Sequence, residues 1–176
     1  LDRHRPIELA IVGDDDAPEA ARPDDLAQLV AVGGPHDQPG GDRPLAIEIG
    51  DDVTINGQST ITGRDSGGSA RAFLSIGDRT YVGWQTTIAV GSRVVVGRDV
   101  KIAGRCLIAG YPGHPLDPEA RAAGLPCDAD QVGPVMLEDG VWLATGVTVV
   151  AGVRIGAGTV VAAGSVVTHD LPARVL

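Results

Sequence analysis

An aliphatic residue returns at every sixth position through the C-terminal part of this chain. Six consecutive positions follow this spacing: Leu137, Leu143, Val149, Ile155, Val161 and Val167. Gly or Ala directly follows several of them, as in Ile155-Gly156 and Val161-Ala162. A period of two would indicate an ordinary amphipathic strand and a period of 3.6 a helix, and neither explains this run.

The same register occurs in three earlier runs, which start at Ile49, Ile76 and Val96. A two-residue slip at residues 89–93 separates the second run from the third. With three hexads in each of these runs and six in the last, the chain holds fifteen hexads. Such a repeat has to be recognised first, because it determines the whole fold.

A period of six has a simple geometric meaning. Each hexad supplies one short strand and one corner, and three corners close a triangular coil of eighteen residues. The aliphatic residue points inward, and the small residue beside it lies at the corner, where it avoids a clash and tolerates unusual backbone angles. Each coil pairs with the coils above and below it. The repeat predicts an all-β protein, a left-handed parallel β-helix of about five coils.

Composition agrees with this fold. Hydrophobic residues make up 43% of the chain and aromatic residues only 3%, so the core consists of Val, Ile, Leu and Ala. Gly accounts for 25 of 176 residues, which suits many tight turns. The length fits one domain with a substantial core.

Three segments break the repeat. Residues 1–44 are acidic and rich in Pro, and we expect a leader, partly ordered or with one short helix at residues 24–32, before a β-helix domain at residues 45–176. Residues 63–72 are polar and rich in Gly and Ser, which indicates a surface loop. Residues 109–134 form a long excursion that contains His114, and a loop of that length is usually functional or disordered.

Three motifs resemble the maltose and galactoside O-acetyltransferase family. Residues 114–121 (HPLDPEAR) resemble the active-site loop of that family, residues 137–144 (LEDGVWLA) resemble one of its coils, and residues 164–172 (GSVVTHDLP) resemble its closing segment. The similarity runs from about Ile76 to Leu176. The resemblance implies an acetyl-CoA-dependent O-acetyltransferase that forms a homotrimer with sites between subunits.

Carried over position by position, the resemblance implies roles for five residues. His114 is the general base, because a neutral imidazole can take the proton of an acceptor hydroxyl at pH 7. Trp142 lies beside CoA, Thr145 near the pantetheine arm, Ala163 at a backbone contact with CoA, and Thr168 near the adenosine end.

The chain departs from the family pattern at the acceptor side and at the C-terminal end. An Asn that helps to hold the acceptor is Gly83 here, and Gln85 is expected to replace it. Asp117 in the loop is a second candidate for acceptor binding or for orienting the histidine. His169 stands where the family has Lys near the CoA phosphates, and the family's continuation beyond Leu176 is absent.

Charge and cysteine content limit other functions. The net charge of −9 disfavours nucleic-acid binding, which needs clustered Lys and Arg. No apolar stretch is long enough to predict a transmembrane helix. Cys106 and Cys127 form no recognisable motif, so we expect reduced thiols in a cytoplasmic protein.

Three alternatives remain at this stage. A γ-class carbonic anhydrase uses the same fold but needs three histidines on zinc, and the four histidines include no closely spaced pair, so no metal is expected. A hexapeptide protein without catalytic activity, acting as a scaffold, is the second. The third keeps the enzyme class but transfers the acetyl group to an amine of an amino sugar or a xenobiotic. The sequence does not reveal the acceptor.

Overall fold

Three parallel sheets make up the part of the chain that the computed structural model describes, which is residues 30–31, 45–63 and 71–176. Sheet A has the order β1 (Val30–Ala31), β4 (Thr60–Gly63), β7 (Thr87–Val90), β10 (Leu107–Ala109), β13 (Thr148–Val150) and β16 (Val166–Val167). Sheet B contains β2 (Ala46–Ile49), β5 (Phe73–Ile76), β8 (Arg93–Val96), β11 (Val135–Leu137) and β14 (Arg154–Ile155). Sheet C contains β3 (Thr54–Ile55), β6 (Tyr81–Val82), β9 (Lys101–Ile102), β12 (Trp142–Leu143) and β15 (Val160–Val161).

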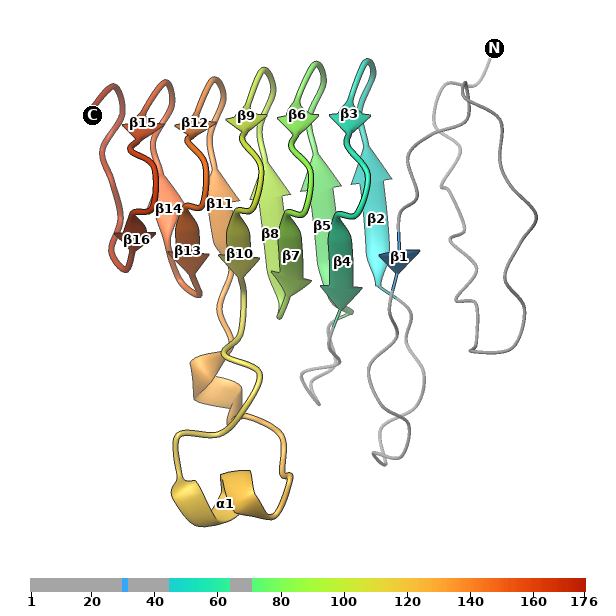
Figure 1. Cartoon of the computed structure of the whole chain (residues 1–176), viewed down its shortest axis with the longest axis vertical. Helices are drawn as coiled ribbons and strands as arrows, with labels where there is room; N and C mark the ends of the chain where they lie inside the picture. Colours follow the sequence, from blue (N-terminus) through green and yellow to red (C-terminus); the bar gives the residue numbers. More distant parts are fainter. Residues whose placement is uncertain (1–29, 32–44, 64–70) are drawn as a thin grey trace, which may run out of the picture.

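The chain visits the three sheets in turn, as Figure 1 shows. The fifteen strands β2 to β16, three in each turn, give five coils, and all neighbouring strands are parallel. The predicted left-handed parallel β-helix of about five coils is therefore confirmed. We call the turn from sheet B to sheet C the first corner, the turn from C to A the second, and the turn from A to B the third.

Two of the interrupting segments fall mainly outside the described residues. Of the helix predicted at residues 24–32, only Val30 and Ala31 are described, and they form a strand that pairs with Thr60 and Ile61. A helix through these two residues is therefore wrong, because their backbone joins sheet A. Most of the loop predicted at residues 63–72 lies outside the described residues.

The hexad positions build the core as expected. Ile76, Val82, Ile102 and Leu143 are at most 1% exposed, and each stacks on its counterpart in the next coil. Burying one such side chain contributes about 1.5–3 kcal/mol relative to exposure. The column of these residues therefore fixes the register of the coils.

Polar residues replace valine at some inward corner positions and are hydrogen-bonded there. Thr80 donates to the carbonyl of Gly97 in the next coil at 2.9 Å, and Thr86 donates to that of Ala103 at 3.2 Å. In the described part of the chain, no buried side-chain nitrogen or oxygen lacks a partner. Hydroxyl groups thus link successive coils without an unsatisfied polar atom.

The glycines that directly follow an inward aliphatic residue, such as Gly77 and Gly83, are required for close packing and not for unusual backbone angles. A Cβ atom on Gly77 would lie 2.7 Å from the Gly97 carbonyl carbon of the next coil, and one on Gly83 would lie 2.5 Å from the Gly104 nitrogen. The positive φ angles occur two residues later, as at Arg79 (57°). The small residue was expected to avoid a clash and to tolerate unusual backbone angles. The second expectation is wrong, because the residue with positive φ comes two positions after the small residue.

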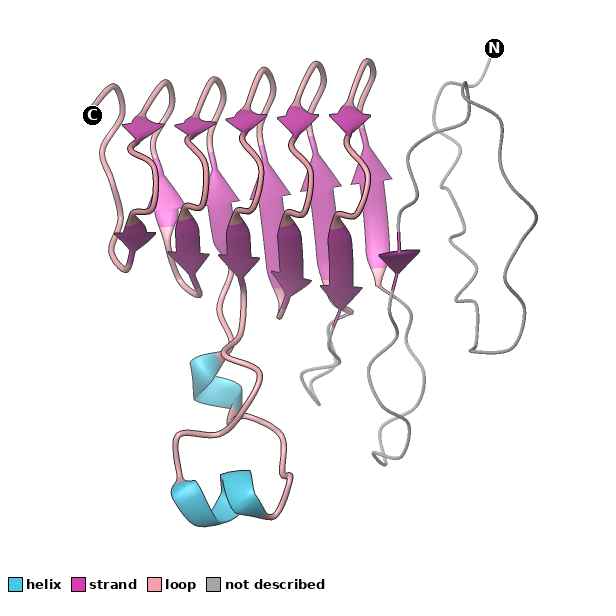
Figure 2. Ribbon diagram, in the orientation of Figure 1, coloured by secondary structure: helices cyan, strands magenta, loops and turns pink. Residues whose placement is uncertain are grey.

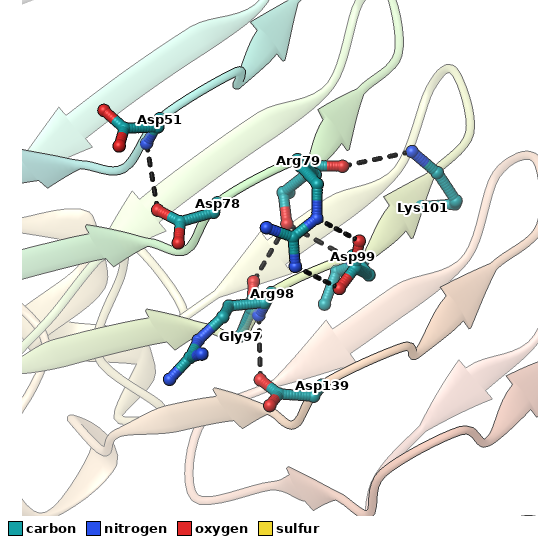
Figure 3. A network of polar contacts seen from close by, with 10 residues as sticks. Asp51, Asp78, Arg79, Gly97, Arg98, Asp99, Lys101 and Asp139 are labelled. Atoms are coloured by element: carbon teal, nitrogen blue, oxygen red, sulfur yellow. Dashed lines mark hydrogen bonds and ion pairs between the residues drawn. The ribbon is translucent and has the colours of Figure 1, made fainter.

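Charged side chains run along the first corner (Figure 3). Arg79 donates to Asp99 through Nε (2.8 Å) and a terminal nitrogen (2.7 Å), and Asp78 accepts from the Asp51 backbone at 2.9 Å. The hydrogen bond from Arg79 lowers the pKa of the Asp99 carboxyl group, and the same contact raises the pKa of Arg79. Arg79 and Asp99 therefore neutralise each other along this corner.

Among the residues that the structure describes, helical structure is confined to short segments within the excursion (Figure 2), namely α1 (Pro118–Ala122) and the 3-10 turn η1 (Ala129–Gln131). In residues 30–31, 45–63 and 71–176, no helix has the length and apolar character needed to cross a membrane.

Candidate active site

The long excursion leaves the β-helix at the third corner, between β10 and β11, and projects beyond the edge of the coils (Figure 1). Its two ends meet, because the Gly133 backbone N–H donates to the Gly110 carbonyl at 3.0 Å. The hydroxyl groups of Tyr111 and Thr62 lie 3.3 Å apart and tie the start of the excursion to sheet A. The insertion therefore leaves the stacking of the coils intact.

His114 lies near the start of the excursion, between Gly113 and Pro115. Gly113 has φ of +87°, a backbone conformation that favours glycine, and Pro115 is buried. His114 is exposed, and its imidazole has no hydrogen bond or ion pair with any described residue. The loop thus presents an imidazole whose nitrogens are available to a ligand.

The residues after His114 brace the loop. The Asp117 side chain caps α1 by accepting from the Ala120 backbone at 2.7 Å. Arg121 donates to the carbonyls of Pro115 and Leu116 at 2.9 and 2.8 Å. One oxygen of Asp117 is therefore occupied by helix capping, and no contact joins its carboxylate to His114 in the described part of the chain.

Trp142 lies on the outer face of sheet C, in register with Lys101 and Val160, and is 51% exposed. Sheet C runs between the first and second corners, so it lies opposite the third corner that carries His114. Figure 1 shows β12 and the excursion at opposite sides of the coils. Within one chain, the structure does not bring Trp142 and His114 together.

Thr145 and Ala163 occupy equivalent positions at the second corner of the last two coils. Both are exposed, and each is followed by a glycine with positive φ, Gly146 (73°) and Gly164 (72°). A Cβ atom on either glycine would have no neighbour within 4 Å. This stretch of the edge is open and free of large side chains.

Thr168 and His169 lie elsewhere, at the third corner of the last coil, after β16. Both are exposed, and the Thr168 hydroxyl lies 2.9 Å from His169 Nδ1. They share the third corner with the excursion of His114, not the edge of Thr145 and Ala163.

Gln85 is exposed at the second corner, two coils before Thr145, with φ of +55°. Its amide donates to the Gln58 side chain at 3.0 Å, and its carbonyl accepts from Arg105 Nε at 3.3 Å. The Arg105 guanidinium stacks over the Trp84 ring at 4.5 Å. Sequence reasoning missed Trp84 and Arg105, although their hexad positions place both on the corner beside Gln85.

The outer face of sheet A separates the two groups of candidates. Its outward residues in β4, β7, β10, β13 and β16 are Thr60, Thr62, Thr87, Ala89, Leu107, Ala109, Thr148, Val150 and Val166. None of these side chains is charged, whereas sheet C exposes Lys101 and sheet B exposes Arg93 and Arg154. Sheet A is bordered by the second and third corners, which are the two edges that hold most of the candidates.

Comparison with known proteins supports the repeat and the fold. Residues 134–169 match the family described as Bacterial transferase hexapeptide (six repeats). The chain carries the transferase hexapeptide repeat. No curated protein matches it by sequence.

Solved structures resemble this chain to different degrees. AntD, an N-acyltransferase from Bacillus cereus in complex with dTDP and 3-hydroxybutyryl-CoA, superposes with a TM-score of 0.53 at 17% identity, over 82% of this chain and 76% of AntD. The polySia-specific acetyltransferase NeuO gives a TM-score of 0.46 at 20% identity, over 73% and 70% of the two chains. The hexapeptide-repeat acetyltransferase VCA0836 from Vibrio cholerae, complexed with acetyl coenzyme A, gives 0.45 at 26% identity, over 82% and 63%.

The described residues offer no preformed metal centre. Across residues 30–31, 45–63 and 71–176, no three His, Cys, Asp or Glu side chains lie close enough together to hold an ion. Cys106 is buried and its thiol donates to the Ala144 carbonyl at 3.3 Å. Burial raises the pKa of this thiol, which makes it a poor nucleophile.

Proposed function

We propose that this protein is a CoA-dependent acyltransferase that moves an acetyl group from acetyl-CoA to a hydroxyl group of a sugar or a similar small acceptor. The observation that carries the proposal is the presentation of His114, which is exposed, has no partner in the described chain and stands on a loop braced by Asp117 and Arg121. Residues 134–169 match a family described as a bacterial transferase hexapeptide. AntD, which has the same coil architecture, was solved with 3-hydroxybutyryl-CoA.

The cofactor fits the open stretch of the second corner. Thr145 and Ala163 leave room for an extended pantetheine arm along the edge, and Trp142 offers an exposed aromatic surface on the adjoining sheet. An aromatic side chain of this kind provides a large apolar contact for a ligand. His169 and Thr168 are proposed for the phosphate and adenosine end.

A homotrimer unites these groups. If three copies present their uncharged sheet A to a common axis, the second corner of one copy comes next to the third corner of its neighbour. His114 of one copy then faces Thr145 and Ala163 of the next, which no single chain achieves. The lack of charge on the outer face of sheet A suits a face buried between subunits.

The reaction needs one base and no acyl-enzyme intermediate. A neutral His114 takes the proton of the acceptor hydroxyl as its oxygen bonds to the thioester carbonyl carbon. The tetrahedral intermediate then collapses, the C–S bond breaks, and the imidazolium returns the proton to the CoA thiolate. The products are the acetyl ester and CoA.

An amine acceptor is the second candidate, because AntD is an N-acyltransferase. A neutral amine attacks the thioester carbonyl carbon, and the same imidazole can then remove a proton from the nitrogen, which is an ammonium in the tetrahedral intermediate. The choice between hydroxyl and amine therefore depends on the acceptor that the site holds, not on His114.

The direct test is CoA release from acetyl-CoA with a panel of sugars, amino sugars and amines, using a thiol reagent. We expect release that depends on the acceptor and falls by about two to four orders of magnitude in His114→Ala, the usual contribution of a general base. His36→Ala serves as a matched control. No release with any acceptor, together with no CoA binding by calorimetry, would favour a scaffold without catalytic activity.

A further inference from the structure

The second corner of the coils that contain β6 and β9 carries a cluster in which only Gln85 has been given an expected role above, that of holding the acceptor. It consists of Trp84, Gln85 and Arg105, with Gln58 one coil before. The Arg105 guanidinium lies 4.5 Å from the centroid of the Trp84 ring, and its Nε donates to Gln85 at 3.3 Å. Trp84 remains 45% exposed although it is an aromatic residue in a chain with few of them.

The fold does not require this cluster. The positions equivalent to Trp84 and Gln85 are Thr145 and Gly146 in the coil of β12, where the corner closes equally well. Gln85 and Arg105 also adopt positive φ angles, 55° and 61°, a backbone conformation that is less favourable for such residues than for glycine. Gln85 and Arg105 therefore stand on this corner although glycine would adopt the same backbone conformation more easily.

The charge of Arg105 is not neutralised within the described chain. The described ion pairs join Arg79 to Asp99 and Arg154 to Glu138, and Arg105 is in neither. Arg105 uses Nε for the Gln85 contact, and its two terminal nitrogens have no acceptor among residues 30–31, 45–63 and 71–176. In a chain of net charge −9, this exposed guanidinium is a local site of opposite sign.

Stacking and the Gln85 bond together hold the guanidinium in one orientation. A fixed planar guanidinium with free terminal N–H groups matches the two oxygens of a carboxylate or phosphate. The exposed part of the Trp84 indole offers an apolar surface against which a sugar ring packs. The cluster therefore has the chemistry to recognise a ring that carries an anion.

We infer that the acceptor is an anionic sugar derivative, bound through its carboxylate or phosphate by Arg105 and through its ring by Trp84, with Gln85 as the residue that orients Arg105. This inference rests on the proposed acyltransferase function. Along the second corner the order is Trp84, Arg105, Thr145 and Ala163, so the acceptor cluster adjoins the stretch assigned to CoA. The acetyl group is transferred where the two meet.

Binding is tested separately from turnover. Trp142→Phe leaves Trp84 as the sole tryptophan, and its fluorescence is titrated with glucuronate, glucose 6-phosphate and UDP-glucose, with glucose as the neutral reference. We expect saturable quenching by at least one anion and roughly ten- to a hundredfold weaker binding in Arg105→Gln, the usual effect of losing a charge-assisted contact. Gln suits this position, because Gln85 and Gln58 already adopt the same positive φ.

Arg98→Gln is the matched control, since it removes an exposed positive charge at the first corner. It should leave the affinity for the anion unchanged. In turnover, Arg105→Gln should raise the KM for the anionic acceptor and leave the KM for acetyl-CoA unchanged.

Three results would overturn the inference. The first is equal affinity for glucose and its anionic derivatives. The second is an equal loss of affinity for the anion in Arg105→Gln and Arg98→Gln. The third is a raised KM for acetyl-CoA in Arg105→Gln, which would assign the cluster to the cofactor. Turnover of neutral sugars without binding of anions would refute this inference while supporting the acyltransferase. Binding of anions that depends on Arg105, without turnover of any acceptor, would refute the acyltransferase and with it the role of the anion as acceptor, and would leave the cluster as an anion-binding site.

Discussion

Adding the same methyl group to two glycines of the second corner should change stability in opposite directions. In Gly83→Ala, the new Cβ would lie 2.5 Å from the Gly104 nitrogen and 2.6 Å from the Ala103 carbonyl carbon. Both are backbone atoms of the next coil, which is held by further hydrogen bonds and cannot move aside cheaply. Overpacking of this kind typically costs about 1–3 kcal/mol, and we expect the upper half of that range here.

Gly57 is a glycine of the same corner one coil earlier, at the position equivalent to Trp84. A Cβ atom there would have no neighbour within 4 Å, and Gly57 is not among the glycines with positive φ. Gly57→Ala should therefore stabilise the fold by about 0.4–1 kcal/mol, because alanine restricts the unfolded chain.

Thermal unfolding followed by circular dichroism separates the two variants. At about 2–4 °C per kcal/mol for a chain of this size, Gly83→Ala should lower Tm by roughly 4–12 °C and Gly57→Ala should raise it by roughly 1–4 °C. Equal shifts, or a neutral Gly83→Ala, would refute the argument that close approach between coils selects glycine at this corner.

Three further predictions concern charge, thiols and the loop. Arg79 lowers the pKa of Asp99 in the folded state, so the stability from this pair is present above the ordinary carboxyl pKa of 3.8. It is lost as the pH falls through the lower pKa of the folded state. Asp99→Asn should remove this part of the dependence of stability on acid pH, measured by urea titrations at several pH values. Buried Cys106 should resist alkylation by iodoacetamide until the protein unfolds, and rapid labelling of this residue in the native state would contradict its burial. Asp117→Ala removes the cap on the Ala120 N–H and should destabilise α1 by about 1 kcal/mol. Hydrogen exchange should then be faster within residues 109–134 alone. Faster exchange throughout the coils would show that Asp117 stabilises more than the loop.

The sequence was sufficient for the fold because a hexad repeat leaves little choice. Ile76, Val82 and Leu143 occupy inward positions as the spacing predicts. The slip at residues 89–93 reflects two extra residues at the third corner, since Ile88 and Val96 are eight positions apart, whereas their counterparts Val149 and Ile155 are six apart.

The positive φ angles were harder to predict, because they occur at Arg79, Gln85 and Arg105, and long polar residues give no sign of a left-handed turn. Once the coils are stacked, the regular spacing of these residues shows that they share corners. Pairing along a corner joins residues about twenty positions apart, which no local pattern indicates.

The site could be predicted only in pieces. His114 and Trp142 followed from short motifs, but their opposite places on one chain depend on which corner the excursion leaves. The partner of His114 lies on another copy in the proposed assembly, so neither the sequence nor one chain contains the complete site.

Mixing of two inactive variants tests the shared site most directly. His114→Ala lacks the base, and Thr145→Trp fills the open stretch proposed for CoA without disturbing the core, since Thr145 is exposed. Both variants are unfolded together in urea, refolded at equal amounts, and assayed for acceptor-dependent CoA release.

In a randomly mixed trimer whose sites each take His114 from one copy and the second corner from its neighbour, one site in four is intact. We therefore expect recovery of about one quarter of wild-type activity from two inactive parents. No recovery in properly folded mixed trimers would show that each chain completes its own site, and would contradict the assembly of this site between copies.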